Sequence, residues 1–201
     1  MKLSLTEEQT MIQDMACRFA ETILEPAATA LDRGDDKPAE RTLFLHNLKQ
    51  LAELGFMGLN VKSEYGGSDA GVVAFSLAIT EVARVCASTA VTMSVTNMVG
   101  EVIQAIASEE QKQRYLPKLC SGDYAAGGFC LSEAGVGSDP AGMKTSAVLE
   151  NDKWVLNGTK MWISSAEYAG IFVICAVTDP MAPKGKGISC FLVEAGTPGL
   201  I

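Results

Sequence analysis

The sequence predicts an α+β protein, with a helical domain over residues 1–122 followed by an incomplete β domain over residues 123–201. Two observations support this prediction. Before Gly122, apolar residues recur about every four positions, as they do on one face of a helix. After Gly122, short β-rich runs alternate with turn residues. The last run stops at Glu194, so a sheet ending there would leave strand edges open to pairing with another chain.

Capping boxes mark the first and the last of the expected helices. Thr6 is followed by Gln9, and Ser108 by Gln111, at the spacing that lets each pair satisfy free N–H groups at a helix start. The last helix runs toward Leu119. The first carries an apolar stripe, and Pro26 lies near the end of that stripe. The stripe consists of Met11, Met15, Phe19 and Ile23.

Three more helices are expected between these two capping boxes. One covers about residues 39–54, with Gly55 as its carboxyl cap. A loop at residues 65–67 precedes the next. Ser88 or Thr89 caps the third, which is rich in small residues and Met. The helix after the loop carries the stripe Val72, Phe75, Ile79 and Val82.

The β domain is expected to contain several short strands joined by turns. An Asn151-Asp152 turn separates two of them, and Asn157-Gly158 predicts a tight turn between extended segments. The β-rich runs are residues 124–131, 144–149, 153–156, 171–177 and 188–193.

Composition narrows the classes of function. Apolar residues make up 48% of the chain and charged residues 20%, as in an ordinary globular protein. The net charge of -8 argues against nucleic acid as a partner, because phosphate binding needs a basic face. No apolar run approaches the roughly 20 residues of a membrane span, and the first helix leaves no room for a signal peptide. We therefore expect a cytoplasmic protein.

Cysteine and histidine usage argues against a structural zinc site. The six cysteines form no C-x-x-C pair, and His46 is the only histidine. Most of the cysteines lie in apolar stretches, so we expect small buried side chains in a reducing compartment. They are Cys17, Cys86, Cys120, Cys130, Cys175 and Cys190.

Residues 129–139 form the first candidate for chemistry, a strand that leads into a loop. The loop holds two closely spaced glycines, two hydroxyls and an acid. Its glycines allow close backbone approach, and successive N–H groups can bind a phosphate or a ring carbonyl. No G-x-G-x-x-G opens a helix here, so it is not a dinucleotide fingerprint. A plain tight turn is the alternative.

Residues 154–166 form the second candidate. On an extended strand Trp162 and Ser164 would share one face, because side chains alternate. A large flat ring beside a hydroxyl suits an aromatic ligand, with the indole packed on the ligand and the hydroxyl bonded to a ring nitrogen. The alternative is a core tryptophan beside a serine at a strand end.

Together the two segments resemble the acyl-CoA dehydrogenase family, and the similarity extends over essentially the whole chain. The pair Ser-Glu-x-x-x-Gly-Ser-Asp and Gly-x-Lys-x-Trp-Ile-Ser is the most specific part. The matching segments are residues 54–58, 65–67, 110–112, 116–117, 131–139, 157–160 and 162–164.

The resemblance implies a subunit with an amino-terminal helical domain, a middle β-barrel domain and a carboxyl-terminal four-helix domain that this chain does not include. FAD would lie between the last two. The implied cofactor contacts are Phe129, Leu131, Ser132, Gly137, Ser138, Trp162, Ile163 and Ser164. Trp162 would back the isoalloxazine, Ser164 would reach its N5 edge, and Ser138 would also lie near the thioester.

The chain departs from the family pattern at three of these loop positions. Ser132 and Ser164 replace a common threonine, which keeps the hydroxyl and its hydrogen bond possible. Ala134 replaces a common proline, which loosens the loop slightly.

The implied reaction is removal of the α proton of an acyl-CoA by a carboxylate, with the β hydrogen passing to the flavin as hydride. Electrons would then go to an electron-transfer flavoprotein, and the subunits would form a dimer or tetramer. The family's base lies beyond residue 201. Glu81, Glu101 and Glu133 are interpreted as helix surface or loop support.

Two other functions stay open. A flavin acyl-CoA oxidase of the same fold would use oxygen as acceptor, and a binding or scaffold fragment would not catalyse at all. For residues 1–201 alone we expect weak or absent FAD binding and no dehydrogenation.

Overall fold

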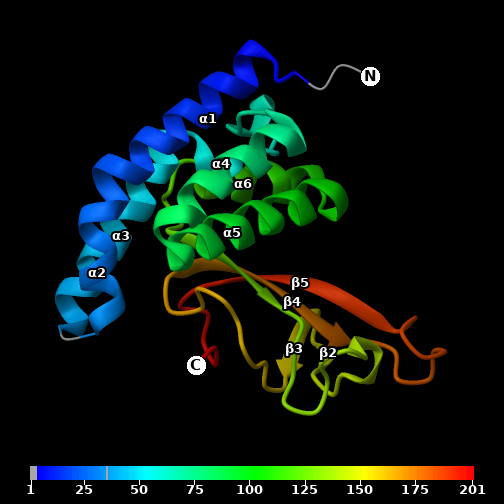
Figure 1. Cartoon of the computed structure of the whole chain (residues 1–201). Helices are drawn as coiled ribbons and strands as arrows, with labels where there is room; N and C mark the ends of the chain where they lie inside the picture. The colour runs from blue at the N-terminus through cyan, green and yellow to red at the C-terminus, as the bar shows by residue number, and fades with distance from the viewer. Residues whose placement is uncertain (1–3, 35) are drawn as a thin grey trace. The chain divides into compact units, whose positions relative to one another are not determined.

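A computed structural model describes residues 4–34 and 36–201 and divides into two compact units, Met1–Gly127 and Gly128–Ile201. The first unit is helical and the second is built on a β-sheet, which confirms the expected change from helix to strand (Figure 1). Within the described residues, no helix is both long and apolar enough to cross a lipid bilayer.

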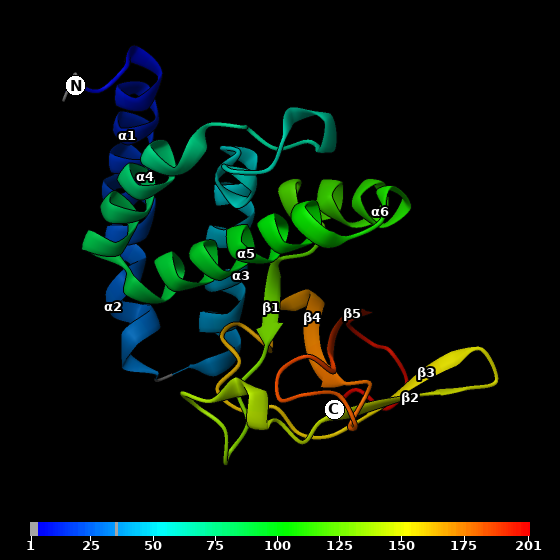
Figure 2. The same ribbon diagram turned by 90° about the vertical axis from the view of Figure 1, so that its right-hand side faces the viewer.

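The helical unit begins with a continuous rod that contains a π-helical turn. Its elements are α1 (Glu7–Phe19), the π turn η1 (Ala20–Leu24), α2 (Glu25–Arg33), α3 (Lys37–Glu53), α4 (Gly71–Val85), α5 (Ala87–Ile106) and α6 (Glu109–Cys120). The 3-10 turns η2 (Phe56–Gly58) and η3 (Ser63–Tyr65) lie between α3 and α4. α1 packs on α4, and α4 packs on α5 (Figures 1 and 2).

The predicted stripe on the first helix is wrong by one position along most of its length. Met11 is 56% exposed, and Met15 and Ile23 are only partly buried. The buried residues are Ile12, Ala16, Phe19, Ala20 and Leu24. Small alanines let α1 approach its neighbour closely, so the larger methionines lie toward the rim. The π turn carries the buried face onward through Ala20 and Leu24.

The expected stripe on α4 also needs correction. On α4 the buried positions are Ala74, Ala78 and Val82, and Val72 is 70% exposed. Pro26 does not end the first helical rod. It lies in the first turn of α2, where its missing N–H is tolerated, and the helix continues to Arg33.

The helix caps agree with the sequence at three ends and differ at one. Both capping boxes are present, and Gly55 ends α3 with a φ of +78°. Ser88 and Thr89 do not cap α5, because the helix already begins at Ala87 with Cys86 as its cap residue. Their hydroxyls instead contact the Cys86 thiol at 3.4 and 3.1 Å.

Asn97 on α5 connects the helix to the η2 turn from inside the core. Its side chain is fully buried. Its Oδ1 accepts from Leu59 N at 2.8 Å, and its Nδ2 donates to Phe56 O at 2.8 Å and to Met93 O at 2.9 Å. The amide thereby satisfies backbone groups that the irregular chain between α3 and α4 leaves unpaired.

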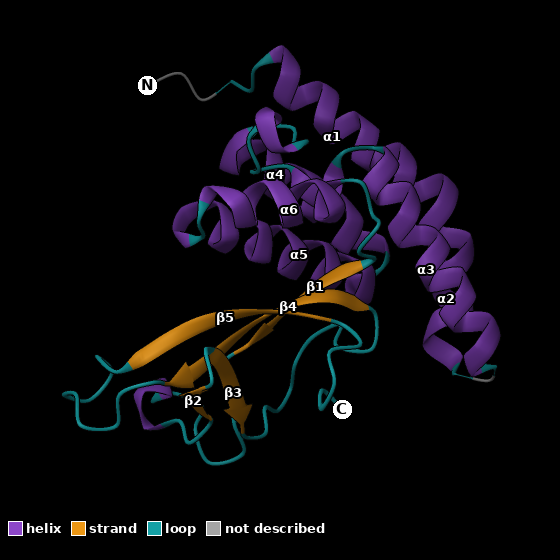
Figure 3. Cartoon of the chain, turned by 180° about the vertical axis from the view of Figure 1, so that it is seen from behind, coloured by secondary structure: helices purple, strands orange, loops and turns teal. Residues whose placement is uncertain are grey.

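The β unit is organised around its longest strand, β4. The strands are β1 (Ala126–Cys130), β2 (Ser146–Glu150), β3 (Lys153–Asn157), β4 (Ala169–Val177) and β5 (Ile188–Glu194). The sheet order is β1-β4-β2-β3, and β5 pairs antiparallel with β4 along its length (Figure 3). β2 joins β4 only at Ser146 opposite Val177, as a parallel pair.

The β2–β3 hairpin confirms the predicted Asn151-Asp152 turn. The two residues have φ of +49° and +61°, the left-handed pair of a two-residue hairpin, and they join Glu150 to Lys153. β2 begins at Ser146 rather than at Lys144, because the amides of Lys144 and Thr145 donate to a side chain described below.

The expected second turn, at Asn157-Gly158, does not join two strands. β3 ends at Asn157, and residues 158–168 are loop and turns before β4 starts. Gly158 is required for space: a Cβ there would lie 2.4 Å from Thr145 Oγ1. Trp162 and Ser164 are therefore not on an extended strand. Trp162 has a φ of +60°, which turns the chain out of any strand.

Candidate functional site

Two loops of the β unit carry the residues expected to bind a ligand. The first loop, residues 131–139, follows β1, and the second loop, residues 158–165, follows β3. Lys160 Nζ donates to Leu131 O at 3.1 Å and to Glu133 Oε1 at 2.9 Å. Met161 N donates to Ser132 O at 2.9 Å. These bonds hold the two loops side by side, although 27 residues separate Glu133 from Lys160.

The Glu133–Lys160 ion pair is largely shielded from water, with each side chain only 9% exposed. Glu133 also accepts from Lys144 N at 2.7 Å and from Thr145 N at 3.0 Å. Burial alone raises the pKa of this carboxyl, but hydrogen bonds from Thr145, Lys144 and Lys160 outweigh it and lower the pKa to about 2. A carboxylate so firmly ionised is a weak base, which agrees with loop support as its role.

The first loop turns sharply and leaves much of its backbone uncovered. Glu133 and Val136 exchange backbone hydrogen bonds of 3.2 and 3.0 Å across the turn. At Gly135 and Gly137 a Cβ would meet no heavy atom within 4 Å, so the space beside both is open. Ser138 is exposed, while Leu131, Ser132 and Phe129 are half-buried. A ligand can therefore approach this backbone closely.

The second loop presents a large aromatic ring to solvent. Trp162 is 86% exposed and holds a φ of +60°, a conformation that costs a non-glycine residue energy and is found preferentially at ligand sites. Ile163 next to it packs against the core cluster Cys130, Ala169 and Phe172. That packing anchors the loop and faces Trp162 outward. Ile163 is therefore partly buried, whereas Ser164 is exposed.

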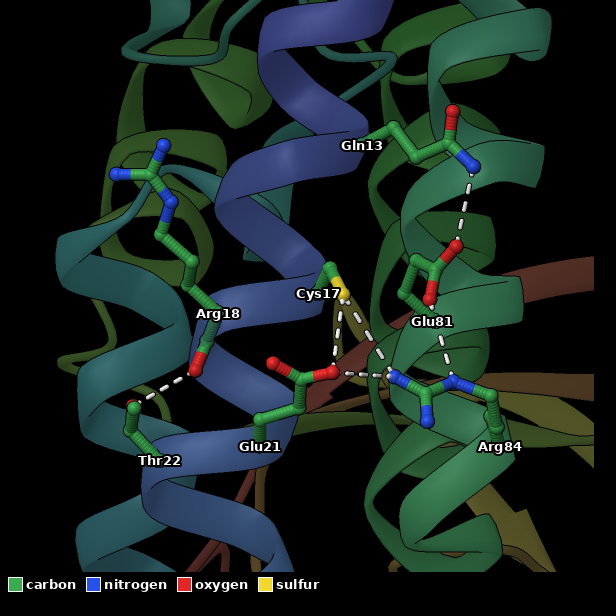
Figure 4. A network of polar contacts seen from close by, with 7 residues as sticks. All are labelled: Gln13, Cys17, Arg18, Glu21, Thr22, Glu81 and Arg84. Carbon is green, nitrogen blue, oxygen red and sulfur yellow. Dashed lines mark hydrogen bonds and ion pairs between the residues drawn. The ribbon is translucent and has the colours of Figure 1, made fainter.

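The other two acids singled out in the sequence lie on the helical unit and are engaged. Glu81 accepts from Gln13 Nε2 at 3.0 Å and pairs with Arg84 at 3.3 Å, within a network that joins α1 to α4 (Figure 4). Arg84 also reaches Glu21 at 3.4 Å. Glu101 accepts from Asn60 Nδ2. These contacts agree with the interpretation of both acids as helix surface.

Cysteines and the histidine form no metal-binding group in the part of the chain that the structure describes. His46 is exposed and contacts Gln50 one turn along α3. Four thiols are buried, as expected: Cys86, Cys120, Cys130 and Cys175. The Glu133–Lys160 contact could not be predicted from a local sequence pattern, because the two residues are 27 positions apart.

Comparison with known proteins shows to which protein family this chain is related. Residues 6–123 match the family profile described as "Acyl-CoA dehydrogenase, N-terminal domain", and residues 128–201 match "Acyl-CoA dehydrogenase, middle domain". The chain belongs to the acyl-CoA dehydrogenase family.

Similar proteins agree with this assignment. The chain is 41% identical over 202 residues to the acryloyl-CoA reductase (NADH) of Anaerotignum propionicum, covering 99% of the chain and 49% of that protein. A chain in the structure described as the electron transferring flavoprotein of Acidaminococcus fermentans superposes with a TM-score of 0.88 at 38% identity, covering 99% of this chain and 50% of that one.

A second solved structure carries a reduced flavin. It is a glutaryl-CoA dehydrogenase from Mycobacterium smegmatis in complex with FADH2, with a TM-score of 0.85 and 32% identity, covering 97% of this chain and 47% of that one. The chain thus spans about half the length of the relatives it matches.

Proposed function

We propose that this chain contributes the flavin-facing part of an enzyme that dehydrogenates acyl-CoA thioesters between the α and β carbons. The observation that carries the proposal is the joining of the two loops, one of which exposes Trp162 while the other leaves open backbone at Gly135 and Gly137. The family relationship and the FADH2 complex of the glutaryl-CoA dehydrogenase support FAD as the group that this surface binds.

The chain's own residues would hold the flavin in three ways. The indole of Trp162 offers a flat apolar face to the ring system, and burial of that face on binding is favourable. Ser164 and Ser132 offer hydroxyl donors, and the Gly137–Ser138 backbone approaches without side-chain obstruction. Leu131 and Phe129 complete an apolar boundary. When bound, FAD supplies the hydride acceptor.

Substrate handling follows from the same surface. Ser138 is exposed at the far end of the first loop, where we propose that it contacts the thioester part of an acyl-CoA. The Glu133–Lys160 pair keeps both loops in position and excludes water beneath them. An electron-transfer flavoprotein as acceptor, a homo-oligomer and a cytoplasmic location belong to the same proposal, the last supported by buried free thiols such as Cys86 and Cys120.

The 41% identity to an acryloyl-CoA reductase favours a second candidate, the reverse reaction on a 2-enoyl-CoA. The two directions share the same binding residues. They are distinguished in the complete enzyme by the electron partner: reduction needs an electron donor, and dehydrogenation needs an acceptor.

Equilibrium dialysis of the complete enzyme with FAD tests the binding proposal. Trp162→Ala should weaken FAD binding about tenfold or more, since stacking of an aromatic ring on a base is worth about 1–3 kcal/mol. Ser164→Ala should weaken it less, about fivefold, because a hydrogen bond is worth about 1 kcal/mol.

The matched control for this experiment is Trp154→Ala, which removes the other tryptophan from the β2–β3 hairpin. Trp154 is 47% exposed and belongs to neither loop, and its ring packs edge-on against Phe191 with 5.4 Å between the ring centroids. FAD binding should be unchanged in this variant. Equal losses in the Trp154 and Trp162 variants would remove the residue-level support for the proposal.

A further inference from the structure

Two cysteines face each other across β4 and β5, outside the two loops. In the antiparallel register Cys175 lies opposite Cys190, and their Sγ atoms are 3.6 Å apart. Both are free thiols. Cys190 is exposed, whereas Cys175 is only 5% exposed. One thiol of the pair therefore meets solvent and the other lies behind it.

The hydrogen-bond pattern shows what kind of cross-strand position this is. Ala195 N donates to Gly170 O at 3.0 Å, and Thr178 N donates to Gly187 O at 2.8 Å, each between directly opposed residues of the same register. Opposed pairs in an antiparallel ladder alternate between hydrogen-bonded and non-hydrogen-bonded. Cys175 is an odd number of positions from both Gly170 and Thr178, so it pairs with Cys190 at a non-hydrogen-bonded position.

A non-hydrogen-bonded position favours a covalent link between the two side chains. Opposed Cα atoms there lie about 4.5 Å apart, within the range of roughly 4.4–6.8 Å that disulfides span. The two sulfurs already touch, so bond formation needs a small rotation of the side chains and leaves the strand pairing intact. Cys130, the other buried thiol of the β unit, lies on β1, which also pairs with β4.

We propose that Cys175 and Cys190 form a site of oxidative modification, at which a hydroperoxide converts the two thiols into a cross-strand disulfide. In the first step the Cys190 sulfur attacks hydrogen peroxide, so that an S–O bond forms, the O–O bond breaks and water leaves. In the second step the Cys175 sulfur attacks the resulting sulfenic acid, so that the S–S bond forms, the S–O bond breaks and a second water leaves. The thiols lose two electrons, and the peroxide gains them.

The environment of the pair determines which sulfur reacts first. Burial, followed by the negative charge of Cys190, raises the pKa of Cys175 to about 12, so Cys175 is unreactive toward an oxidant in solution. Cys190 meets the oxidant because it is exposed. A sulfenic acid at Cys190 carries no thiolate charge, which removes that repulsion and places an electrophilic sulfur beside Cys175.

Peptide mapping after oxidation tests the proposal directly. The reduced chain is treated with hydrogen peroxide, unfolded with a thiol-alkylating reagent and digested with trypsin without reductant. Trypsin cuts after Lys160, Lys184 and Lys186, so Cys175 lies in peptide 161–184 and Cys190 in a peptide that begins at residue 187. We expect these peptides to appear joined, at a mass about 2 Da below the sum of the reduced pair. The other four cysteines should remain alkylated.

Three variants separate the steps. Cys190→Ser changes an exposed residue, so the fold is kept, and the linked species should disappear. Cys175→Ala should leave a sulfenic acid on Cys190 that dimedone traps, whereas the unsubstituted chain should lose that species as the disulfide forms. Cys130→Ser, at the buried thiol of β1, should form the link as the unsubstituted chain does. A Cys130–Cys175 link, intermolecular dimers through Cys190, or alkylated Cys175 and Cys190 after full peroxide consumption would each overturn the proposal.

Discussion

Glu133 shows at the scale of a single residue how a buried charge can act as structure. Its carboxylate accepts hydrogen bonds from the backbone amides of Lys144 and Thr145 and from the ammonium of Lys160. All three donors lie outside regular helices and strands. A buried ion pair stabilises only when its remaining hydrogen-bonding capacity is met, and here the backbone meets it. The residue thereby sets the relative position of the two loops without contacting a ligand itself.

Replacing Glu133 should therefore disturb stability and the loops together. Glu133→Gln leaves the Lys160 ammonium buried without a counter-charge, which should lower the free energy of unfolding by about 3 kcal/mol. The amides of Lys144 and Thr145 should exchange their hydrogens faster. The double variant with Lys160→Met should cost less than the sum of the two single changes, because both remove one interaction. Additive costs in urea unfolding would contradict the coupling.

The same carboxylate should make the fold sensitive to acid in a defined window. Its pKa falls from an ordinary 4.5 to about 2 on folding. A lowered folded-state pKa contributes stability that is fully present above about pH 4.5 and is lost as the pH falls toward 2. Urea unfolding at a series of pH values should show the difference between the unsubstituted chain and Glu133→Gln shrinking across this window. A difference that stays constant would show that the carboxylate is not the titrating group.

At the scale of elements, Asn97 joins helix α5 to the irregular chain before α4. Asn97→Ala leaves Leu59 N and Phe56 O buried without their partner, so we expect a loss of about 2–4 kcal/mol in the free energy of unfolding. Asn47→Ala on α3 is the matched control. Asn47 is 1% exposed, and its amide atoms have no partner among the described residues. Removing it should cost clearly less, as urea unfolding followed by far-UV circular dichroism will show.

In the β2–β3 hairpin, two substitutions at Asp152 should change the free energy of unfolding in opposite directions. Asp152 adopts a φ of +61°, which glycine takes without steric cost and a β-branched residue takes poorly. Asp152→Gly should raise the free energy of unfolding slightly, by about 0.5 kcal/mol, and Asp152→Val should lower it by about 1 kcal/mol or more. Thermal unfolding of both variants measures this. The same sign for both would show that the turn does not limit the hairpin.

The sequence predicts features that depend on neighbouring residues, and it misses features that depend on residues distant in the sequence. The capping boxes at Thr6 and Ser108 and the Asn151-Asp152 turn depend on neighbouring residues, so their patterns suffice. The buried face of α1 depends on a π turn and on close helix packing, which no periodicity shows. Asn157-Gly158 has the composition of a hairpin turn, yet its glycine is needed for contact with Thr145.

The candidate site divides in the same way. The family resemblance implies that both motif segments contact one cofactor, and Lys160 and Met161 hold the two segments together. Alternation along a strand was the wrong basis for placing Trp162. Its exposure comes from a left-handed turn and from Ile163, whose packing against a core formed by β1 and β4 is invisible in local sequence.

At the scale of the whole molecule, none of the three acids singled out is positioned to remove a proton. Glu133 is held ionised, and Glu81 and Glu101 are occupied by neighbours on the helical unit. We therefore predict no dehydrogenation by residues 1–201 alone. The test mixes the chain with FAD, a panel of acyl-CoA thioesters and an artificial electron acceptor. Turnover would show that a base lies within this chain, and Glu133→Gln and Glu101→Gln would then identify it.

The division of the chain into two units gives the molecule a built-in pair of optical reporters. Both tryptophans, Trp154 and Trp162, belong to Gly128–Ile201, and Met1–Gly127 contains none. Indole fluorescence therefore reports on the sheet unit alone, while the far-ultraviolet helical signal comes from the other unit. Recording both during one denaturation shows whether the units melt in one cooperative event or in two, without any label being attached.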